Sequence, residues 1–453
     1  MRHRFIRLAG VLSVTVAITF GAPDEAAGIS LIRDAEIENT IRDYATPLFR
    51  AAGLDADAVR VHLVKDSSLN AFVAGGMRVF IHTGLLLATK SPGQLIGVIA
   101  HETGHIAGGH LARTNDMLRG ARTEAIVGYI LGLAVAIAGA PEAGQALILG
   151  GQALSQQSIL LYSRSQEQSA DQFAVTVLER TGQSARGLIE FLEIMGAGES
   201  EDQQILYLRT HPLSKDRMKF VANHLANSVY TNTPPLAQFE ETFRRMQAKL
   251  RGFLDPPART LARYPGTDQS LEARYARAVA YHLQAELSLA LGEIDSLLAD
   301  RPRDPYFHEL KGQILFESGR VSEAVKSYRR AVELLPDAPL LRVGLAHAMI
   351  ETGDPTVLAD AAVRLEVAVR QDRDDPHAWR LLSIAYGRIG RRGLSVLASA
   401  ERALLTGRYG DAVGFSKRAA KLVPDGSPSQ LRAADIQRSA EEALKKKKKR
   451  RGG

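Results

Sequence analysis

LIGVIAHETGHIAGGHLA, residues 95–112, is the stretch of this sequence around which the rest of the fold can be placed. It follows Ser91, Pro92 and Gln94, which are typical of a helix start. Ser caps the first turn, Pro fits the first helical position, and Gln completes a capping box. The stretch is therefore predicted to be a helix, and on a helix His101 and His105 lie one turn apart on the same face.

Two imidazoles on one helical face can bind a single tetrahedral zinc ion. Glu102 would then lie beside the metal, where its carboxylate can accept a proton from an activated water and later deliver it to a leaving amine. The chain contains no cysteine, so any metal must be held by His, Glu, Asp or water. The pattern therefore indicates a hydrolytic zinc site.

A third protein ligand must come from elsewhere in the chain, and two patterns compete for it. The metzincin pattern needs a histidine six residues after the second one, but Leu111 stands there and His110 is one residue short. Segment 163–171 instead offers Glu167 and Asp171, which face the same way on a helix. Glu167 is therefore the candidate zinc ligand, and Asp171 the candidate residue that orients one of the two histidines. The alternative is a solvated acidic helix face, although apolar neighbours place this face against the core.

These residues resemble the zinc metallopeptidases related to HtpX and the CAAX prenyl endopeptidases, within the gluzincins. In that family the third ligand is the first Glu of a helical E-x-x-x-D motif, which Glu167 and Asp171 match. Further agreement is found in Asn70-Ala71-Phe72, in Gly84-Leu85-Leu86, and from Thr210-His211-Pro212 to Asp216-Arg217. Relatives often carry another Glu where this chain has Gln168 and Ser169 between the two acids.

The resemblance implies a set of site residues. The zinc ligands would be His101, His105 and Glu167, with Glu102 as general base and Asp171 behind a ligand histidine. In relatives the histidine matching His211 can approach the zinc from a loop and close the site, and the arginine matching Arg217 lies near the same cleft. A capping role before Pro212 is the alternative for His211. The strand around 77–81 would be the edge along which an extended substrate pairs.

The remaining patterns predict a mainly α-helical protein with a small β-sheet. Apolar residues at helical spacing predict a helix over 29–54, and alternation predicts a strand over 59–64. Two short strands are expected around Gly75 and Gly76, followed by a turn at Thr83. With the resemblance, the fold class is a gluzincin metalloprotease domain followed by an α-solenoid of tetratricopeptide repeats.

The repeats begin near residue 271. Segment 305–338 carries the small and aromatic residues of a tetratricopeptide unit of about 34 residues, namely Gly312, Ala324, Tyr328, Ala331 and Pro336. Segment 271–304 follows the same pattern in phase, the spacing from 339 to 375 is stretched, and later units are degenerate. Each helix pair buries its apolar face only against a neighbour, so three or four units are expected to form a curved array.

Domain limits follow from the prolines and from the two ends of the chain. Basic residues followed by the uncharged stretch 8–22 match a secretory signal peptide, assigned to 1–28, with an uncleaved membrane anchor as the alternative. Prolines between 232 and 268 predict the boundary between a protease domain at 29–265 and a repeat domain at 266–444. The tail 445–453 is expected to be basic and disordered.

Charge and hydropathy limit the partners. The net charge is +7, and the run from Lys445 to Arg451 holds seven positive charges, so the body is neutral and no nucleic-acid partner is indicated. Between Ala125 and Leu154 two apolar stretches flank Pro141. They predict a buried helical hairpin, with peripheral membrane contact or a cover over the site as the alternative.

The leading functional hypothesis is an exported zinc endopeptidase whose repeats hold unfolded or misassembled protein clients. The whole layout resembles the periplasmic BepA type, which implies quality control in outer-membrane protein assembly, possible contact with the assembly machinery through the repeats, and possible association with the membrane. A repeat-based periplasmic chaperone or scaffold with a latent protease site is the alternative. An intramembrane protease would need several long apolar spans that the body lacks.

Overall fold

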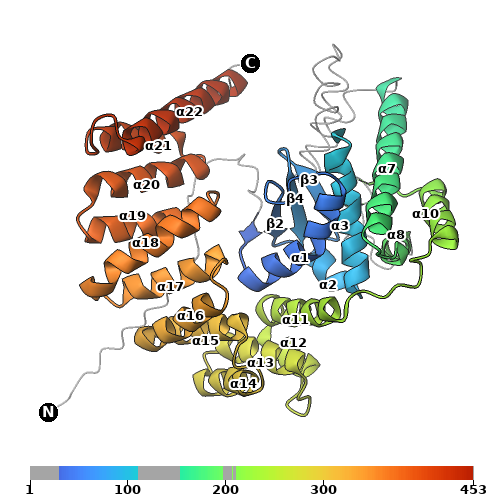
Figure 1. Cartoon of the computed structure of the whole chain (residues 1–453), viewed down its shortest axis with the longest axis horizontal. Helices are drawn as coiled ribbons and strands as arrows, with labels where there is room; N and C mark the ends of the chain where they lie inside the picture. The colour runs from blue at the N-terminus through green and yellow to red at the C-terminus, as the bar shows by residue number, and fades with distance from the viewer. Residues whose placement is uncertain (1–29, 111–153, 197–206, 208–210, 452–453) are drawn as a thin grey trace. The chain divides into compact units, whose positions relative to one another are not determined.

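The computed structural model of this chain describes residues 30–110, 154–196, 207 and 211–451 (Figure 1). Their N-terminal half contains one small sheet and the helices α1 (Ala35–Ala51), α2 (Thr83–Ala88), α3 (Pro92–Ala107), α7 (Leu154–Arg180), α8 (Arg186–Gly196), α10 (Lys215–Asn227), α11 (Ala237–Leu254) and α12 (Pro257–Arg263). The C-terminal half is helical throughout, with α13 (Leu271–Leu283), α14 (Leu287–Asp300), α15 (Pro305–Glu317), α16 (Val321–Leu334), α17 (Pro339–Glu351), α18 (Pro355–Gln371), α19 (Pro376–Arg388), α20 (Arg392–Leu405), α21 (Tyr409–Ala420) and α22 (Pro428–Arg451). The fold class predicted from the sequence is confirmed.

The sheet has four strands in the order β1-β2-β4-β3, and this order corrects one prediction. The strands are β1 (Leu31–Ile32), β2 (Arg60–Val64), β3 (Ala71–Ala74) and β4 (Arg78–His82). β2 and β4 are parallel, whereas the two outer pairs are antiparallel. β4 therefore lies inside the sheet, and the strand expected at the substrate edge is not an edge strand. The edge beside it is β3.

Two local boundaries also differ from the prediction. The helix expected from residue 29 begins only at α1, because the Asp34 carboxylate caps it by accepting a hydrogen bond from the Ile37 amide at 2.9 Å. Glu38 in turn accepts a hydrogen bond from the Asp34 amide at 3.3 Å, and β1, which precedes this cap, pairs with β2. The turn expected at Thr83 is instead the start of α2.

Helix α3 begins as predicted and is held tightly between its neighbours. The Ser91 hydroxyl accepts a hydrogen bond from the Gln94 amide at 3.3 Å, and Pro92 is the first helical residue. A Cβ on Gly97 would lie 2.7 Å from the Leu188 backbone in α8, and a Cβ on Gly104 would lie 2.7 Å from the carbonyl oxygen of Ala170 in α7. These glycines let α3 approach both helices closely, and the apolar side chains around it form one core with α1, the sheet and α11.

The repeat helices α13 to α22 form five consecutive pairs in the described part of the chain, which is more than the three or four units expected. A Cβ on Gly312 would lie 2.9 Å from the Tyr328 ring, so this glycine allows α15 and α16 to pack closely. α18 has 17 residues where α16 has 14, which accounts for the stretched spacing. α22 runs to Arg451, so the basic segment expected to be disordered continues a helix as far as that residue.

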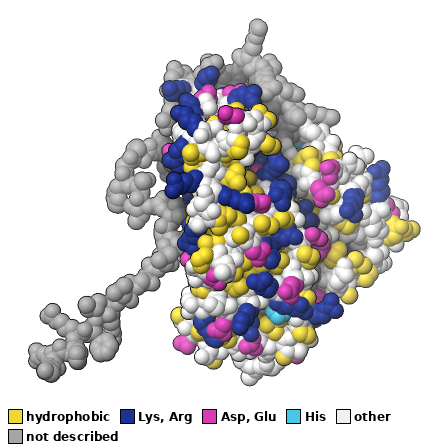
Figure 2. Space-filling view, turned by 60° about the vertical axis from the view of Figure 1, so that its left-hand side comes forward, with side chains coloured by type: hydrophobic (Ala, Val, Ile, Leu, Met, Phe, Trp, Pro, Cys, Tyr) yellow, Lys and Arg dark blue, Asp and Glu magenta, His cyan; other side chains and the backbone are white. Residues whose placement is uncertain are grey.

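The outer surface of the repeats exposes both charge and apolar area. Figure 2 shows hydrophobic side chains on the forward face with Lys and Arg side chains on either side of them. The large exposed hydrophobic residues of the repeats are Leu283, Leu289, Val363, Leu405, Leu422 and Leu431. Single exposed apolar residues of this kind are ordinary on a protein surface.

The proline-rich segment predicted as a domain boundary contains α11 and α12, and α11 contacts both halves of the chain. Apolar residues of α11 belong to the same core as α3, while its Gly252 packs against Val279 of α13. The Lys249 ammonium lies 2.8 Å from Asp34 and 3.3 Å from Glu309 of α15. The division at residue 265 stays a prediction.

A set of buried and partly buried charges surrounds this contact, and we call it the junction cluster. Its members are Asp34, Glu36, Arg245, Lys249, Asp304 and Glu309. Arg245 pairs with Glu36 at 2.8 Å and with Asp304 at 2.6 Å. The Tyr275 hydroxyl of α13 donates to Glu36 at 2.5 Å. Helix α11 is thus bound to the second repeat by ion pairs, and α1 to the first repeat by the hydrogen bond between Glu36 and Tyr275.

Two sequence predictions lie outside the described residues: the signal peptide at 1–28 and nearly all of the apolar hairpin, from Ala125 to Ala153. Among the helices that the structure does describe, none combines the length and the hydropathy needed to cross a membrane.

Candidate metal centre

Helix α3 carries the first two candidate ligands toward the interior. His101 is fully buried, and its Nε2 atom lies 3.1 Å from Nε2 of His105. Glu102 is also buried, and neither of its carboxylate oxygens has a hydrogen-bond partner. The helical spacing thus turns two imidazoles toward one point and leaves a carboxylate beside them.

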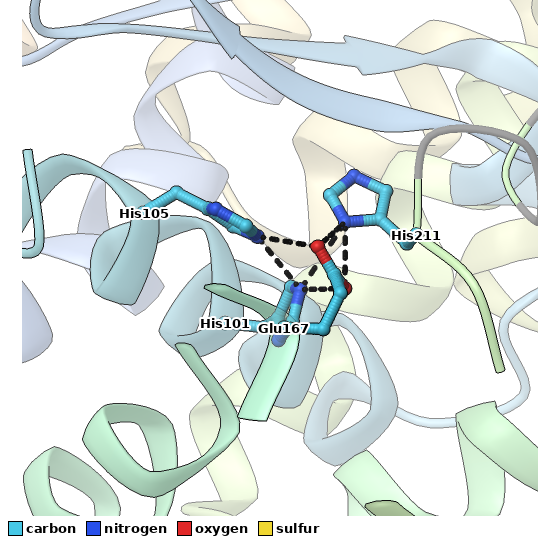
Figure 3. A group of neighbouring side chains, drawn as sticks. All are labelled: His101, His105, Glu167 and His211. Carbon is cyan, nitrogen blue, oxygen red and sulfur yellow. Dashed lines mark hydrogen bonds and ion pairs between the residues drawn. The ribbon is translucent and has the colours of Figure 1, made fainter. Parts of the chain in front are cut away.

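Helix α7 places Glu167 between these two imidazoles (Figure 3). Its Oε2 atom lies 3.2 Å from His101 Nε2, and its Oε1 atom lies 3.3 Å from His105 Nε2. The contact of Gly104 with the α7 backbone makes this approach possible. Glu167 therefore reaches the cluster from a segment that is distant in the sequence.

His211 completes a group of four, which we call the histidine cluster: His101, His105, Glu167 and His211. It lies just before α10, with Nδ1 at 3.2 Å from both Glu167 oxygens and 3.3 Å from His101 Nε2. Its backbone amide donates to the Tyr207 carbonyl at 2.7 Å, and the two rings stack at 4.6 Å. One ligand atom from each of the four residues lies within 4.8 Å of all the others.

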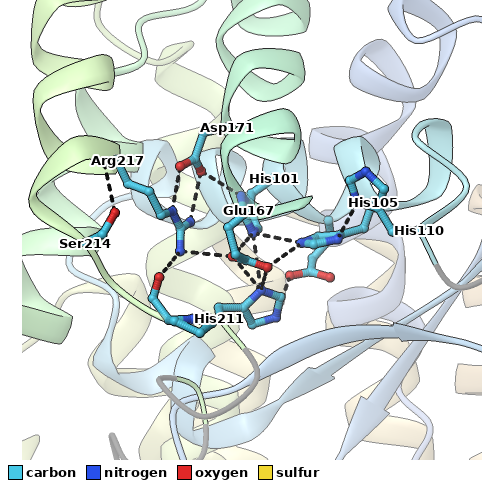
Figure 4. Close-up of polar contacts among 10 residues, drawn as sticks. His101, His105, His110, Glu167, Asp171, His211, Ser214 and Arg217 are labelled. Carbon is cyan, nitrogen blue, oxygen red and sulfur yellow. Dashed lines mark hydrogen bonds and ion pairs between the residues drawn. The ribbon is translucent and has the colours of Figure 1, made fainter. Parts of the chain in front are cut away.

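Asp171 and Arg217 support the histidine cluster through contacts with His101 and Glu167 (Figure 4). Asp171 Oδ1 lies 2.8 Å from His101 Nδ1, and the Arg217 guanidinium donates to both Asp171 oxygens at 2.6 and 2.9 Å. The same guanidinium lies 2.9 Å from Glu167 and donates to the Pro212 carbonyl at 3.1 Å. Arg217 is fully buried, so it ties Glu167 to the loop that carries His211.

The electrostatics of these groups follow from burial and from one another. Burial opposes the charged form of His101, but hydrogen bonds with Asp171 and Glu167 raise its pKa to about 9. Burial lowers the pKa of His105 to about 3. Burial also opposes ionisation of Glu167, yet the charge of His211 and hydrogen bonds with the histidines hold its pKa well below its usual range. Burial raises the pKa of Glu102, which suits a residue that exchanges protons.

The residues present fit a zinc ion. Three imidazoles and an ionised carboxylate are ligand types that zinc prefers, and they converge from three segments of the chain. The Nε2 atoms of His101 and His105 lie 3.1 Å apart, close enough for one cation to bind both once neither atom carries a proton. The Nε2 atom of His211 and both oxygens of Glu102 have no hydrogen-bond partner, although these two side chains lie 3.5 Å apart.

Two residues of the site were missed by the sequence analysis. His110, dismissed as a third ligand, lies with Nδ1 2.9 Å from Nδ1 of His105. Tyr207 is buried under His211, and burial raises its pKa well above the usual range. Neither follows a spacing rule, although the pair Gly108-Gly109 before His110 signals a change of chain direction. His62 and His82 lie on the sheet, where their rings contact Phe80 and Phe72, respectively.

Comparisons with known proteins agree with this geometry. Residues 32–224 match Peptidase family M48, and residues 315–385 match a tetratricopeptide repeat family. The chain is 27% identical to the beta-barrel assembly-enhancing protease of Escherichia coli K12 over 410 residues, which is 89% of this chain and 82% of that protein. The protein of the same name in Yersinia pestis is 27% identical, over 90% of this chain and 84% of its own length. The mitochondrial metalloendopeptidase OMA1 of Schizosaccharomyces pombe is 29% identical over 36% of this chain and 46% of its own length.

Proposed function

We propose that this chain, a zinc metalloendopeptidase with an M48 peptidase domain and C-terminal tetratricopeptide repeats, degrades or processes misfolded or stalled proteins during outer-membrane protein assembly. The similarity to beta-barrel assembly-enhancing proteases runs through the peptidase domain and the repeats together, and this shared layout is the main support for the proposal. It also supports a location in the periplasm, reached through the signal peptide at 1–28.

The site residues take the following roles in this proposal. His101, His105 and Glu167 hold the zinc ion, which when bound acts as a Lewis acid toward the peptide carbonyl and makes water a stronger nucleophile near neutral pH. Glu102 accepts the proton of the attacking water and passes it to the leaving amine. Its raised pKa favours that second transfer.

The supporting residues act through these groups. Asp171 fixes His101 by accepting a hydrogen bond from its Nδ1 atom at 2.8 Å. The resemblance places Arg217 near the cleft; its buried guanidinium faces Asp171 and Glu167, and we assign it a positioning role. His211 occupies the position that substrate or water would need, so it would keep the resting site closed until its loop moves.

Substrate is expected to pair with β3, because this is the edge strand beside β4 in the described sheet. The repeats bring protein clients to the protease, as tetratricopeptide arrays are protein-binding surfaces. The first two repeats already bind α1 and α11 through the junction cluster. Client binding is therefore expected on the later repeats, which would also contact the assembly machinery, while the apolar segment from Ala125 to Leu154 would provide any peripheral contact with the membrane.

The decisive experiment is the Glu102→Gln variant of the full chain. Gln keeps the shape of Glu but cannot accept the proton, so cleavage of an unfolded polypeptide should fall by roughly 10²–10⁴-fold while zinc content stays unchanged. Glu193→Gln, an exposed glutamate of α8, is the matched control and should cleave like the wild type. Unchanged cleavage by Glu102→Gln would instead favour a repeat-based scaffold.

A further inference from the structure

His110 makes a contact with the histidine cluster that the roles above do not use. It lies directly after α3, is almost fully buried, and its Nδ1 atom is 2.9 Å from Nδ1 of His105. The two rings meet edge to face with centroids 5.0 Å apart (Figure 4). His105 therefore has a partner on the side of its ring that faces away from the other ligands.

The chain is built locally to bring His110 back toward α3. The helix ends at Ala107, and Gly109 has a φ of +62°, a conformation that favours glycine. A Cβ on Gly108 would lie only 2.4 Å from the Nε2 atom of His110, so the ring lies directly over this residue. Two consecutive glycines thus reverse the chain and make room for the imidazole.

With zinc bound at the proposed site, the same distances set where the protons lie. Nε2 of His105 faces the cluster, at 3.3 Å from Glu167 and 3.1 Å from His101. An imidazole nitrogen that binds a metal carries no proton, so the proton of His105 must be on Nδ1. Nδ1 of His110 lies at hydrogen-bond distance from it and must then accept, with its own proton on Nε2.

We propose that His110 is a positioning residue that fixes the tautomer and the ring orientation of His105, as Asp171 does for His101. The inference rests on the zinc site assigned above. The two partners differ in chemistry: Asp171 is a carboxylate paired with Arg217, whereas His110 contacts its ligand through an imidazole nitrogen.

The first test compares His110→Ala with His110→Asn in the full chain, by competition for zinc with a chromophoric chelator. Loss of an outer hydrogen-bond partner of a ligand typically weakens metal binding by roughly 10–100-fold, and His110→Ala should fall in this range. The side-chain oxygen of Asn can stand where Nδ1 of His110 stands, so His110→Asn should recover most of the affinity. His347→Ala, a partly buried histidine of α17, should bind zinc like the wild type.

The second test moves the ring without removing it. Gly108 has a φ of −69°, which alanine adopts freely, so Gly108→Ala adds only the Cβ that meets His110. This variant should weaken zinc binding in the wild-type background and have no further effect in His110→Ala, because the two changes break the same contact.

Thermal unfolding separates positioning from packing. With chelator present, all variants should unfold near the wild-type temperature, and the stabilisation by added zinc should be smaller in His110→Ala. Wild-type zinc affinity in His110→Ala would overturn the proposal, as would a His110→Asn variant no better than His110→Ala. If the wild-type chain itself binds no zinc, the proposed function fails first and this inference fails with it.

Discussion

The histidine cluster and the junction cluster are both buried groups of charged side chains, yet they are built on opposite principles. In the junction cluster positive and negative groups alternate, so that Lys249 and Arg245 each lie between carboxylates. In the histidine cluster the ligand atoms of the four residues lie close to one another. The Arg217 guanidinium pairs with Glu167 and lies outside this group of ligand atoms. Alternation of charge stabilises contact between segments, whereas convergence of lone pairs prepares a place for a cation.

The largest effect is expected for Glu167→Ala, which tests whether the histidine cluster is a cation site. It removes the carboxylate that faces the imidazoles, so zinc should fall from about one ion per chain to a small fraction, and cleavage should be lost while the helical content is unchanged. Metal analysis and circular dichroism of the purified protein measure both. His101→Ala should behave in the same way.

His211 is a fourth donor and could replace the lost ligand. Zinc retained in Glu167→Ala but absent from the double variant with His211→Ala would identify His211 as a ligand. Stoichiometric zinc in Glu167→Ala and also in the double variant would contradict the assignment of Glu167 as a ligand.

The second test is Lys249→Met, which removes a positive charge from the junction cluster. It leaves Asp34, Glu36 and Glu309 without their shared ammonium, which should lower the free energy of unfolding by about 3–5 kcal/mol. Denaturant unfolding measures this loss, and zinc content should not change. Lys311→Met is the matched control, because its pair with Asp295 is partly exposed and should contribute only about 0–1 kcal/mol. Equal losses in the two variants would show that the junction cluster has no special role.

The third test concerns the closed state of the histidine cluster. His211→Ala should keep the zinc ion and raise the basal cleavage of an unfolded protein, because it frees the position in front of the metal. The cleavage rate and the zinc content are measured on the same sample. A large loss of activity with normal zinc would instead assign His211 to stabilisation of the transition state.

The smallest effect is a pH dependence of the junction cluster. Burial raises the pKa of Glu309 to about 7, although Lys249 opposes this shift. Because the folded-state pKa lies above the usual value, the folded state binds more protons than the unfolded state between about pH 4.5 and 7, and ionisation of Glu309 reduces stability as pH rises through that window. Glu309→Gln cannot ionise, so its unfolding temperature relative to the wild type should be higher at about pH 8.5 than at about pH 5.5. An unchanged difference between the two would mean that Glu309 is already ionised at the lower pH.

The parts of the site that could be predicted from the sequence are those fixed by helical geometry. His101, Glu102 and His105 lie within two turns of one helix, and the interval between Glu167 and Asp171 places both on one face of another. Local spacing determines such positions whatever the rest of the chain does.

The remaining features depend on contacts between distant segments. His110 reaches His105 because the chain reverses at Gly109. Helical or strand periodicity does not predict the direction that the chain takes after such a reversal. β4 lies inside the sheet only because β2 pairs with it in parallel, a choice that alternation within one strand cannot reveal. The prolines around α11 indicate a domain boundary. The ion pairs of Lys249 in α11 depend on residues as distant as Asp34 and Glu309, which the local pattern cannot reveal.

The attachment of the array through α13 and α15 has a consequence for how such enzymes diversify. Ion pairs hold this end of the array to the peptidase half, and among the described residues further pairs from Arg33 and Arg78 reach as far as Asp372 and Asp374, before α19. We therefore expect that repeats beyond that point can be exchanged, lengthened or lost without disturbing the catalytic half. Chimaeras joined after α18 should therefore keep the peptidase of this chain and acquire the client preference of the donor.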